Sequence, residues 1–286
     1  MSLSRLLLLL LVGISTRAVA QSTAASLLWS IEGQGIKKSY IFGTVHMLPA
    51  KDFAIKPKVK RAIQKSDIMV MELDLDNPMV QVELMKDIKL ENDDKLSNYL
   101  SDEDAVLLSN YMEDHIGSPL SSFDHLKPFF LTSMLIPTYI EGDVASFERH
   151  LVEIAQSQKM EIIGLEKAEG QLKIFDEIPI EKQLSQIMDL VKDKGEAQKK
   201  FDAILSAYKT EDIHRLVATT LEQIGDDNYQ KEAVLWNRNK DWVEKIPQMA
   251  AKEKCFIAVG AAHLGGDQGV ISLLKERGYT LTPIIK

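Results

Sequence analysis

Two histidines in the sequence follow a glycine by three residues, each just after an apolar segment. Gly43-Thr44-Val45-His46 follows the segment that ends at Phe42, and Gly260-Ala261-Ala262-His263 follows the one that ends at Val259. In an open α/β sheet, binding sites form beyond the carboxyl ends of the strands. If both segments are strands of one sheet, the two histidines can therefore share one pocket.

Two glutamates stand in the same relation to apolar segments. Glu72 follows Ile68–Met71, and Glu166 follows the segment 162–165. Imidazole nitrogens and carboxylate oxygens suit a divalent metal with an open position for water. Such a water is acidified and can attack a carbonyl, with a spare carboxylate as general base. Asp74 and Asp76 alternate with Glu72, but a strand end running into solvent explains them better.

The remaining pattern indicates strands separated by helices. A hairpin is expected around the turn 33–35, and a helix is expected from Pro57. Residues 79–158 read mostly as helical, and Asp267 is a candidate cap for a helix near the C-terminus. Further strands are expected at 68–71, 161–165, 256–259 and 279–285. Strands alternating with helices predict an α/β fold, with a central sheet and flanking helices.

A long helical stretch is expected over residues 181–250, where apolar stripes recur at helical spacing. Trp236 and Trp242 are expected to pack inward on either side of the polar break 237–239. We expect these helices to cover the strand ends and Arg238 to reach Glu72 or Glu166. Arg238 could then bind substrate or orient a carboxylate, or form a structural salt bridge. The first role predicts that Arg238→Ala reduces activity far more than stability.

The N-terminus has the features of an export signal. Arg5 precedes an apolar run, and Ala18-Val19-Ala20 forms a small-x-small cleavage pattern, which predicts a signal peptide over 1–20 and a single domain over 21–286. The run from Leu6 to Ile14 is too short for a spanning helix of ~20 residues. We therefore expect an exported protein, periplasmic or extracellular, without a stable membrane anchor after cleavage.

Composition excludes several classes of protein. The predicted signal contains two arginines and no acid, so residues 21–286 keep 32 of the 34 basic residues against 42 acidic ones, a net charge of −10. Such a chain is a poor candidate for binding nucleic acid or anionic lipid. Cys255 is the one cysteine and lies in an apolar segment, where a buried thiol is expected.

Taken in order, these motifs resemble the TraB/GumN family, which includes the pheromone-shutdown proteins and the TIKI proteases. The matching residues are Gly43–His46, Glu72, Glu166, Arg238-Asn239 and Gly260–His263. The resemblance implies a fold similar to the erythromycin-esterase and ChaN-like group. It also implies a metal-dependent hydrolase, because TIKI proteases are described as metalloproteases that use two Gly-x-x-His motifs and a glutamate.

We therefore predict a metal-dependent hydrolase that acts on peptide bonds. His46, His263 and Glu166 are the expected metal ligands, Glu72 the general base or a further ligand, and Arg238 a stabiliser of a carboxylate or an oxyanion. Mn, Co, Fe and Zn are not distinguished by such a donor set. One alternative is a non-catalytic protein that binds a peptide or polysaccharide in the same cleft. Another is a structural hydrogen-bond network at the end of the sheet.

Overall fold

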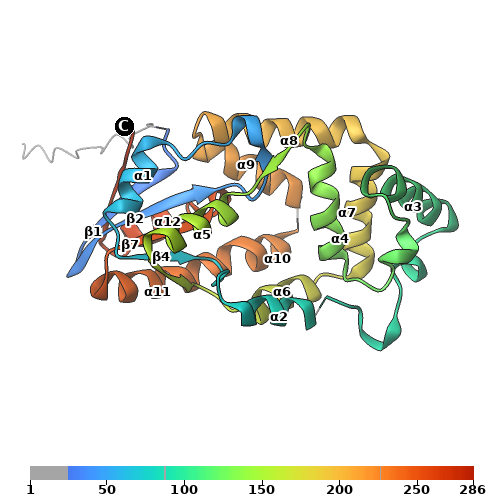
Figure 1. Ribbon diagram of the computed structural model, residues 1–286, viewed down its shortest axis with the longest axis horizontal. Coiled ribbons are helices and arrows are strands. Elements are labelled where there is room, and N and C mark those ends of the chain that lie inside the picture. Colours follow the sequence, from blue (N-terminus) through green and yellow to red (C-terminus); the bar gives the residue numbers. More distant parts are fainter. Residues whose placement is uncertain (1–24, 87, 226) are drawn as a thin grey trace, which may run out of the picture.

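A computed structural model describes residues 25–86, 88–225 and 227–286, so the predicted signal peptide lies outside the described residues. Six strands form the central sheet in the order β6-β4-β7-β2-β1-β8 (Figure 1). Their bounds are β1 Leu28–Gly33, β2 Ile36–Thr44, β4 Ile68–Met71, β6 Glu161–Gly164, β7 Cys255–Gly260 and β8 Thr280–Pro283. The pairs β6/β4, β4/β7 and β7/β2 are parallel, whereas β1 is antiparallel to both β2 and β8. The predicted α/β class and the hairpin are thus confirmed.

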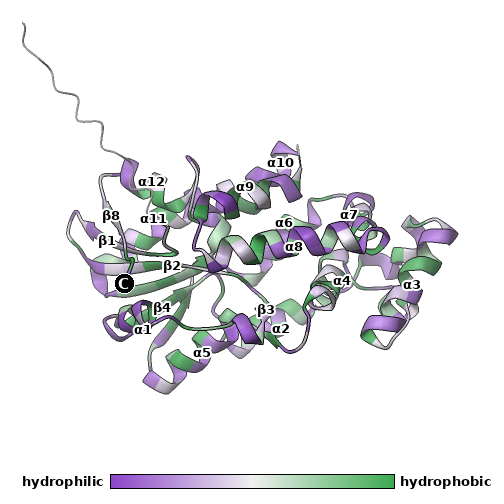
Figure 2. Ribbon diagram, turned by 90° about the horizontal axis from the view of Figure 1, so that it is seen from above, coloured by the Kyte–Doolittle hydropathy of each residue, from purple (hydrophilic) through white to green (hydrophobic). Residues whose placement is uncertain are grey.

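Helices cover both faces of this sheet. Figure 2 shows α1 and α5 on one side of the sheet and α11 and α12 on the other. The helices are α1 Pro57–Gln64, α2 Pro78–Lys86, α3 Asp102–Ile116, α4 Pro128–Leu135, α5 Phe147–Gln158, α6 Ala168–Asp176, α7 Ile180–Lys192, α8 Lys194–Lys209, α9 Ile213–Ile224, α10 Asn228–Lys231, α11 Asn237–Lys252 and α12 Val270–Glu276. Shorter elements are the paired strands β3 Leu48–Pro49 and β5 Val144–Ala145, the 3-10 turns η1 Ala50–Asp52, η2 Glu91–Asp93, η3 Leu96–Tyr99, η4 Leu120–Ser122, η5 Ile136–Tyr139 and η7 Ala261–His263, and the π-helical turn η6 Glu232–Trp236.

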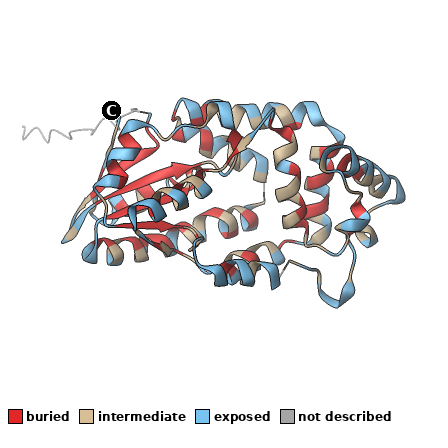
Figure 3. Cartoon of the chain, viewed as in Figure 1, coloured by how far each residue is buried: buried red, intermediate tan, exposed pale blue. Residues whose placement is uncertain are grey.

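Burial explains why the central strands read as continuous apolar runs. Every residue of β4 is buried, as are the first five of β7, because helices cover both faces (Figure 3). The covering helix α11 buries Trp242, Val243 and Ile246 at helical spacing. These strands and helices form the main hydrophobic core.

A second hydrophobic core lies away from the sheet. It joins α3, α4, α7 and the start of α8, with Leu108, Leu131 and Ile187 fully or almost fully buried. Figure 1 shows α8 running from this helical lobe back toward the sheet. No helix among the described residues is long and apolar enough to cross a membrane.

Two local expectations were wrong. Asp267 does not cap a helix, because α12 begins at Val270 and Gly269 holds the N-cap position. The polar residues 237–239 do not break the helix either. The chain passes from α10 through the π-helical turn η6 directly into α11, so Arg238, in the first turn of α11, lies inside a continuous helical stretch.

Candidate active site

The four residues predicted from the strand ends follow four adjacent parallel strands. The order β6-β4-β7-β2 places Glu166, Glu72, His263 and His46 side by side along the carboxyl edge of the sheet. Backbone pairing continues past the strands, since Glu166 N donates to Glu72 O at 2.9 Å. The predicted convergence of these residues on one edge is therefore present.

Gly43 allows the first motif to pack closely against the second. A Cβ atom on Gly43 would lie 2.7 Å from Leu264 Cδ1 and 3.0 Å from Ala261. Contacts this short exclude any side chain at position 43 unless its neighbours move. The glycine thus brings the two strand ends together.

Arg238 joins the two glutamates. Its Nη2 lies 2.5 Å from both Glu72 Oε2 and Glu166 Oε1, and its Nε lies 3.0 and 3.1 Å from the two oxygens of Glu166. The three side chains are only 10–14% exposed. The guanidinium also stacks over the Trp242 ring, 4.8 Å from its centroid. The expected contact of Arg238 with these carboxylates is confirmed, and it involves both of them.

All five N–H donors of Arg238 are used inside the protein. Besides the bonds to the carboxylates, Nη1 donates to Val234 O at 3.1 Å and to His263 Nε2 at 3.3 Å. The carbonyl of Val234 belongs to the π-helical turn just before α11. A substrate oxyanion could bind Arg238 only if one of these bonds were released.

His263 is buried and held as a neutral imidazole. Its Nδ1 donates to Asn239 Oδ1 at 2.7 Å, while Asn239 Nδ2 donates to Gln268 O at 2.8 Å, which fixes the orientation of the amide. Burial lowers the pKa of His263 to about 3, with a further lowering by Arg238. The lone pair on Nε2 faces Arg238.

His46 stands in the opposite surroundings. Its side chain is 72% exposed, and its Nδ1 donates to Glu148 Oε1 at 3.1 Å. Glu148 also accepts hydrogen bonds from Thr44 Oγ1 at 3.0 Å and Ser146 Oγ at 3.2 Å, so the carboxylate is fixed in place. The hydrogen bond with Glu148 raises the pKa of His46 to about 9, against the effect of desolvation.

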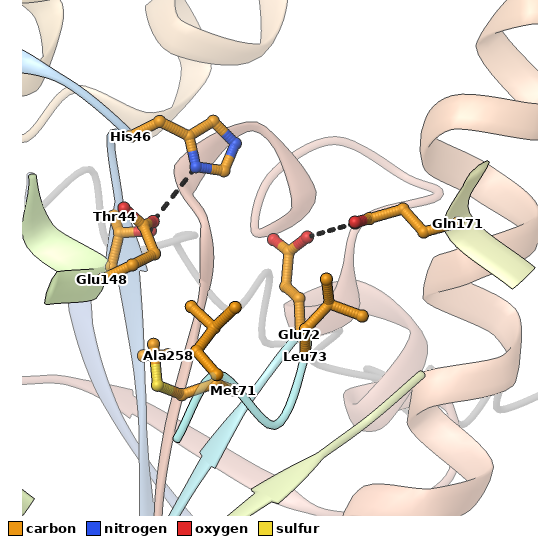
Figure 4. Close-up of a pocket in the computed structure, with 9 residues that line it drawn as sticks. Thr44, His46, Met71, Glu72, Leu73, Glu148, Gln171 and Ala258 are labelled. Carbon is orange, nitrogen blue, oxygen red and sulfur yellow. Dashed lines mark hydrogen bonds and ion pairs between the residues drawn. The ribbon is translucent and has the colours of Figure 1, made fainter. Parts of the chain in front are cut away.

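His46 and Glu72 face one pocket. Figure 4 shows His46 with Glu148 on one side and Glu72 with Gln171 on the other. The cavity has a volume of about 170 Å³ and is lined by Thr44, His46, Met71, Glu72, Leu73, Leu75, Glu148, Gln171 and Ala258. Glu166, His263 and Arg238 do not line it. The structure thus divides the predicted site into an open half and a half that Arg238 occupies.

The two glutamates differ in their affinity for a proton. Burial raises the pKa of both. At Glu72, Arg238 together with His263, His46 and the backbone N–H of Gly260 outweighs burial and lowers the pKa to about 2. At Glu166 burial prevails over Arg238, and the neighbouring charge of Glu72 raises the pKa further. Glu72 is therefore the ionised carboxylate at the pocket wall.

The side chains at this edge are chemically suited to a divalent metal, but they are not arranged as a ligand set. No three His, Cys, Asp or Glu side chains among the described residues are grouped closely enough to hold an ion. Arg238 engages Glu166, Glu72 and the Nε2 atom of His263 together. His46, His263 and Glu166 were predicted from the sequence to bind a metal together. Their arrangement in the structure does not fit that prediction.

Two important partners were not found from the sequence. Glu148 stands beside Arg149 in the sequence and belongs to none of the motifs, but it lies in the first turn of α5, and its side chain, 20% exposed, faces His46. Asn239 is 1% exposed and holds His263. Asp74 was expected to lie in solvent, whereas its Oδ1 is buried without a hydrogen-bond partner among the described residues. For Glu148 the sequence does hold one local signal. Ser146 is a typical helix N-cap, and it places Glu148 in the first turn of α5, where the Ser146 hydroxyl donates to its carboxylate.

The fold is an α/β sheet in which two histidines and two glutamates follow four adjacent parallel strands. The TraB/PrgY/gumN family model matches residues 27–283, and the chain belongs to that family. It is similar to the metalloproteases TIKI2 of Danio rerio (20% identity, 92% of this chain, 62% of the relative) and TIKI1 of Xenopus tropicalis (24%, 91% and 61%). The chain thus spans about three fifths of the length of these curated relatives. No solved structure matches, so the likeness to the erythromycin-esterase and ChaN-like group stays a prediction.

Proposed function

We propose that this protein is a hydrolase that cleaves peptide bonds in the pocket between His46 and Glu72. The observation that carries the proposal is the His46–Glu148 pair. A carboxylate fixes Nδ1–H of the imidazole, and within the described part of the chain Nε2 makes no hydrogen bond. An imidazole held in this way and open to solvent can transfer protons during hydrolysis.

The proposed reaction assigns one task to each side of the pocket. In its neutral form, which predominates above the pKa of about 9, His46 takes a proton on Nε2 from water as the water oxygen bonds to the peptide carbonyl carbon. The C–N bond then breaks, and Nε2 returns the proton to the leaving nitrogen, so that a carboxylic acid and an amine are released. Glu72, ionised at the opposite wall, accepts a hydrogen bond from the attacking water and orients it.

The walls of the pocket indicate the part of the substrate that it holds. Met71, Leu73, Leu75 and Ala258 supply an apolar lining beside the polar groups. A volume of about 170 Å³ is smaller than the ~300–1,000 Å³ of pockets that enclose a whole small ligand. We propose that the pocket takes one apolar side chain next to the scissile bond of an extended peptide.

The names of the TIKI relatives support hydrolysis of protein substrates and a metal requirement. A divalent metal supplies a Lewis acid and an acidified water in such enzymes. Because the side chains at this edge do not form a ligand set, no step of the proposed reaction passes through a metal. Export of the protein, predicted from its N-terminal sequence, also remains a proposal.

Peptide turnover tests the function. The protein is incubated with a mixed peptide library, with and without a chelator, and the new termini are identified by mass spectrometry. We expect cleavage beside apolar residues that is lost in His46→Gln and retained in His214→Gln, which changes an exposed histidine outside the pocket. Peptide binding without any new termini would instead support the non-catalytic alternative and end the proposal.

A further inference from the structure

The half of the site behind the pocket has a cation of its own. Arg238 donates to Glu72, to both oxygens of Glu166 and to His263 Nε2, the atoms that a metal at this position would need. Two of these groups are carboxylates, and a guanidinium between them gives each a charged hydrogen bond. The position expected for a metal is filled by a side chain.

Arg238 is held in this position from both sides. On one side its Nη1 donates to Val234 O in the π-helical turn, and on the other its guanidinium lies over Trp242, which is completely buried. π-Helical turns are rare and often occur at functional sites. The carbonyl of η6 and the Trp242 ring together hold the guanidinium beside the two carboxylates.

A metal ion next to Arg238 would face repulsion between two cations at hydrogen-bond range. It would also find His263 Nε2 already accepting a hydrogen bond, with the imidazole turned by Asn239 so that this atom points at Arg238. A metal ion could use Glu166 or His263 only after the guanidinium had moved away.

We infer that Arg238 is the resident cation of this edge and that Glu166 and His263 are not metal ligands in the folded protein. This inference goes beyond the proposed hydrolysis, which uses His46 and Glu72 on the pocket side. It assigns Arg238 a positioning role: the guanidinium holds Glu72 ionised and correctly oriented at the pocket wall. Arg238 would then compete with a metal ion for Glu166 and His263.

Metal binding can be measured apart from activity. Chelator-treated full chain is titrated with Co²⁺, followed by visible absorption and calorimetry, for the wild type, Glu166→Gln, His263→Gln and Arg238→Gln. We expect Glu166→Gln and His263→Gln to change the Co²⁺ affinity of the wild type less than about threefold. Arg238→Gln should bind Co²⁺ at least about tenfold more tightly, and the gain should vanish in Arg238→Gln/Glu166→Gln. Arg277→Gln, which removes an exposed arginine paired with Glu244, is the matched control and should bind like the wild type.

Two results of the Co²⁺ titration would overturn the inference. One equivalent of Co²⁺ bound by the wild type and weakened about tenfold or more by Glu166→Gln or His263→Gln would overturn the inference, as would a folded Arg238→Gln variant that binds no more tightly. If Arg238→Gln does not fold, the comparison of the wild type with the Glu166 and His263 variants decides alone. Peptide turnover is scored separately, so an inactive protein with these binding results ends the proposed function and leaves the inference standing.

Discussion

His46 and His263 occupy the same motif at the ends of adjacent parallel strands, yet their surroundings are opposite. His46 is largely exposed and paired with a carboxylate, and its pKa is raised to about 9. His263 is 5% exposed, paired with an amide and next to a guanidinium, and its pKa is lowered to about 3. At neutral pH one imidazole is cationic and the other is neutral.

This difference arises from elements far from the motif in sequence. Glu148 comes from the first turn of α5, on one side of the sheet, and Asn239 and Arg238 come from α11, on the other side (Figure 2). The motif places an imidazole at the sheet edge, and the covering helix determines its protonation. Two copies of a motif therefore do not imply two equal ligands.

The largest expected effect comes from removing the charge at the His263 side. Arg238→Ala leaves Glu72 and Glu166 buried without a counter-charge, which should cost about 3–5 kcal/mol of unfolding free energy. Urea denaturation measures this loss. Arg277→Ala, which breaks an exposed pair with Glu244, should cost less than about 1 kcal/mol. A loss no larger than that control would restore the sequence-based expectation that Arg238 matters for activity and little for stability.

The next effect tests the partner of His46. Glu148→Gln keeps an oxygen acceptor but removes the negative charge, so the pKa of His46 should fall well below about 9. Because the proposed reaction uses the neutral imidazole as proton acceptor, turnover should reach its plateau at lower pH than in the wild type. Plateau turnover should fall about tenfold because the ring is held less firmly. NMR titration of His46 checks the shift, and an unchanged pKa would show that Glu148 is not its cause.

The reciprocal change tests the partner of His263. Asn239→Asp puts a carboxylate where His46 already has one, so the pKa of His263 should rise from about 3. The rise should be smaller than the fall at His46, because Arg238 remains beside Nε2 and opposes a second positive charge. The same NMR experiment follows it. If the pKa of His263 in Asn239→Asp stays at about 3, then burial, and not the group at position 239, sets that pKa.

The smallest expected effect is on the pH dependence of stability, and it comes from Glu211, which lies near the strand end that precedes His46. Tyr208 donates to Gly43 O, and the nearby Glu211 accepts from Leu27 N and from the buried Lys58. Burial raises the pKa of Glu211, but Lys56 and Lys58 outweigh it, so the folded pKa lies below 4.5. A lowered carboxyl pKa stabilises the fold above the unfolded value, and the contribution is lost as pH falls through the folded value. Unfolding free energies of Glu211→Gln should therefore decline less steeply below about pH 4.5 than those of the wild type, and parallel curves would contradict this.

Much of the sheet and of its edge could be predicted because strand periodicity and strand ends are local properties. Four apolar segments that end in His, Glu, Glu and His are visible in the sequence, and parallel strands bring such ends together. The contact of Arg238 with the carboxylates followed from the one polar break in an apolar pattern. These features depend on residue type and spacing alone.

Contacts between side chains that lie far apart in the sequence could not be predicted in the same way. Glu148 lies among charged residues on α5 that resemble a solvated face, and it reaches His46 because the start of α5 contacts the end of β2. The helix continues through residues 237–239 after a π-helical turn, and that turn was not predicted from the sequence. The predicted role of Asp267 as a cap was wrong because α12 begins at Val270, with Gly269 in the N-cap position.

The central claim is that the His46 side performs the chemistry and the His263 side supports it. The most direct test measures kcat/KM for a cleaved peptide together with the melting temperature in His46→Gln and His263→Gln. We predict that His46→Gln loses at least about 100-fold in kcat/KM while its stability changes by less than about 0.5 kcal/mol. His263→Gln should lose about 1–3 kcal/mol of stability, because buried hydrogen bonds are broken. Wild-type turnover in a folded His46→Gln variant would contradict the account.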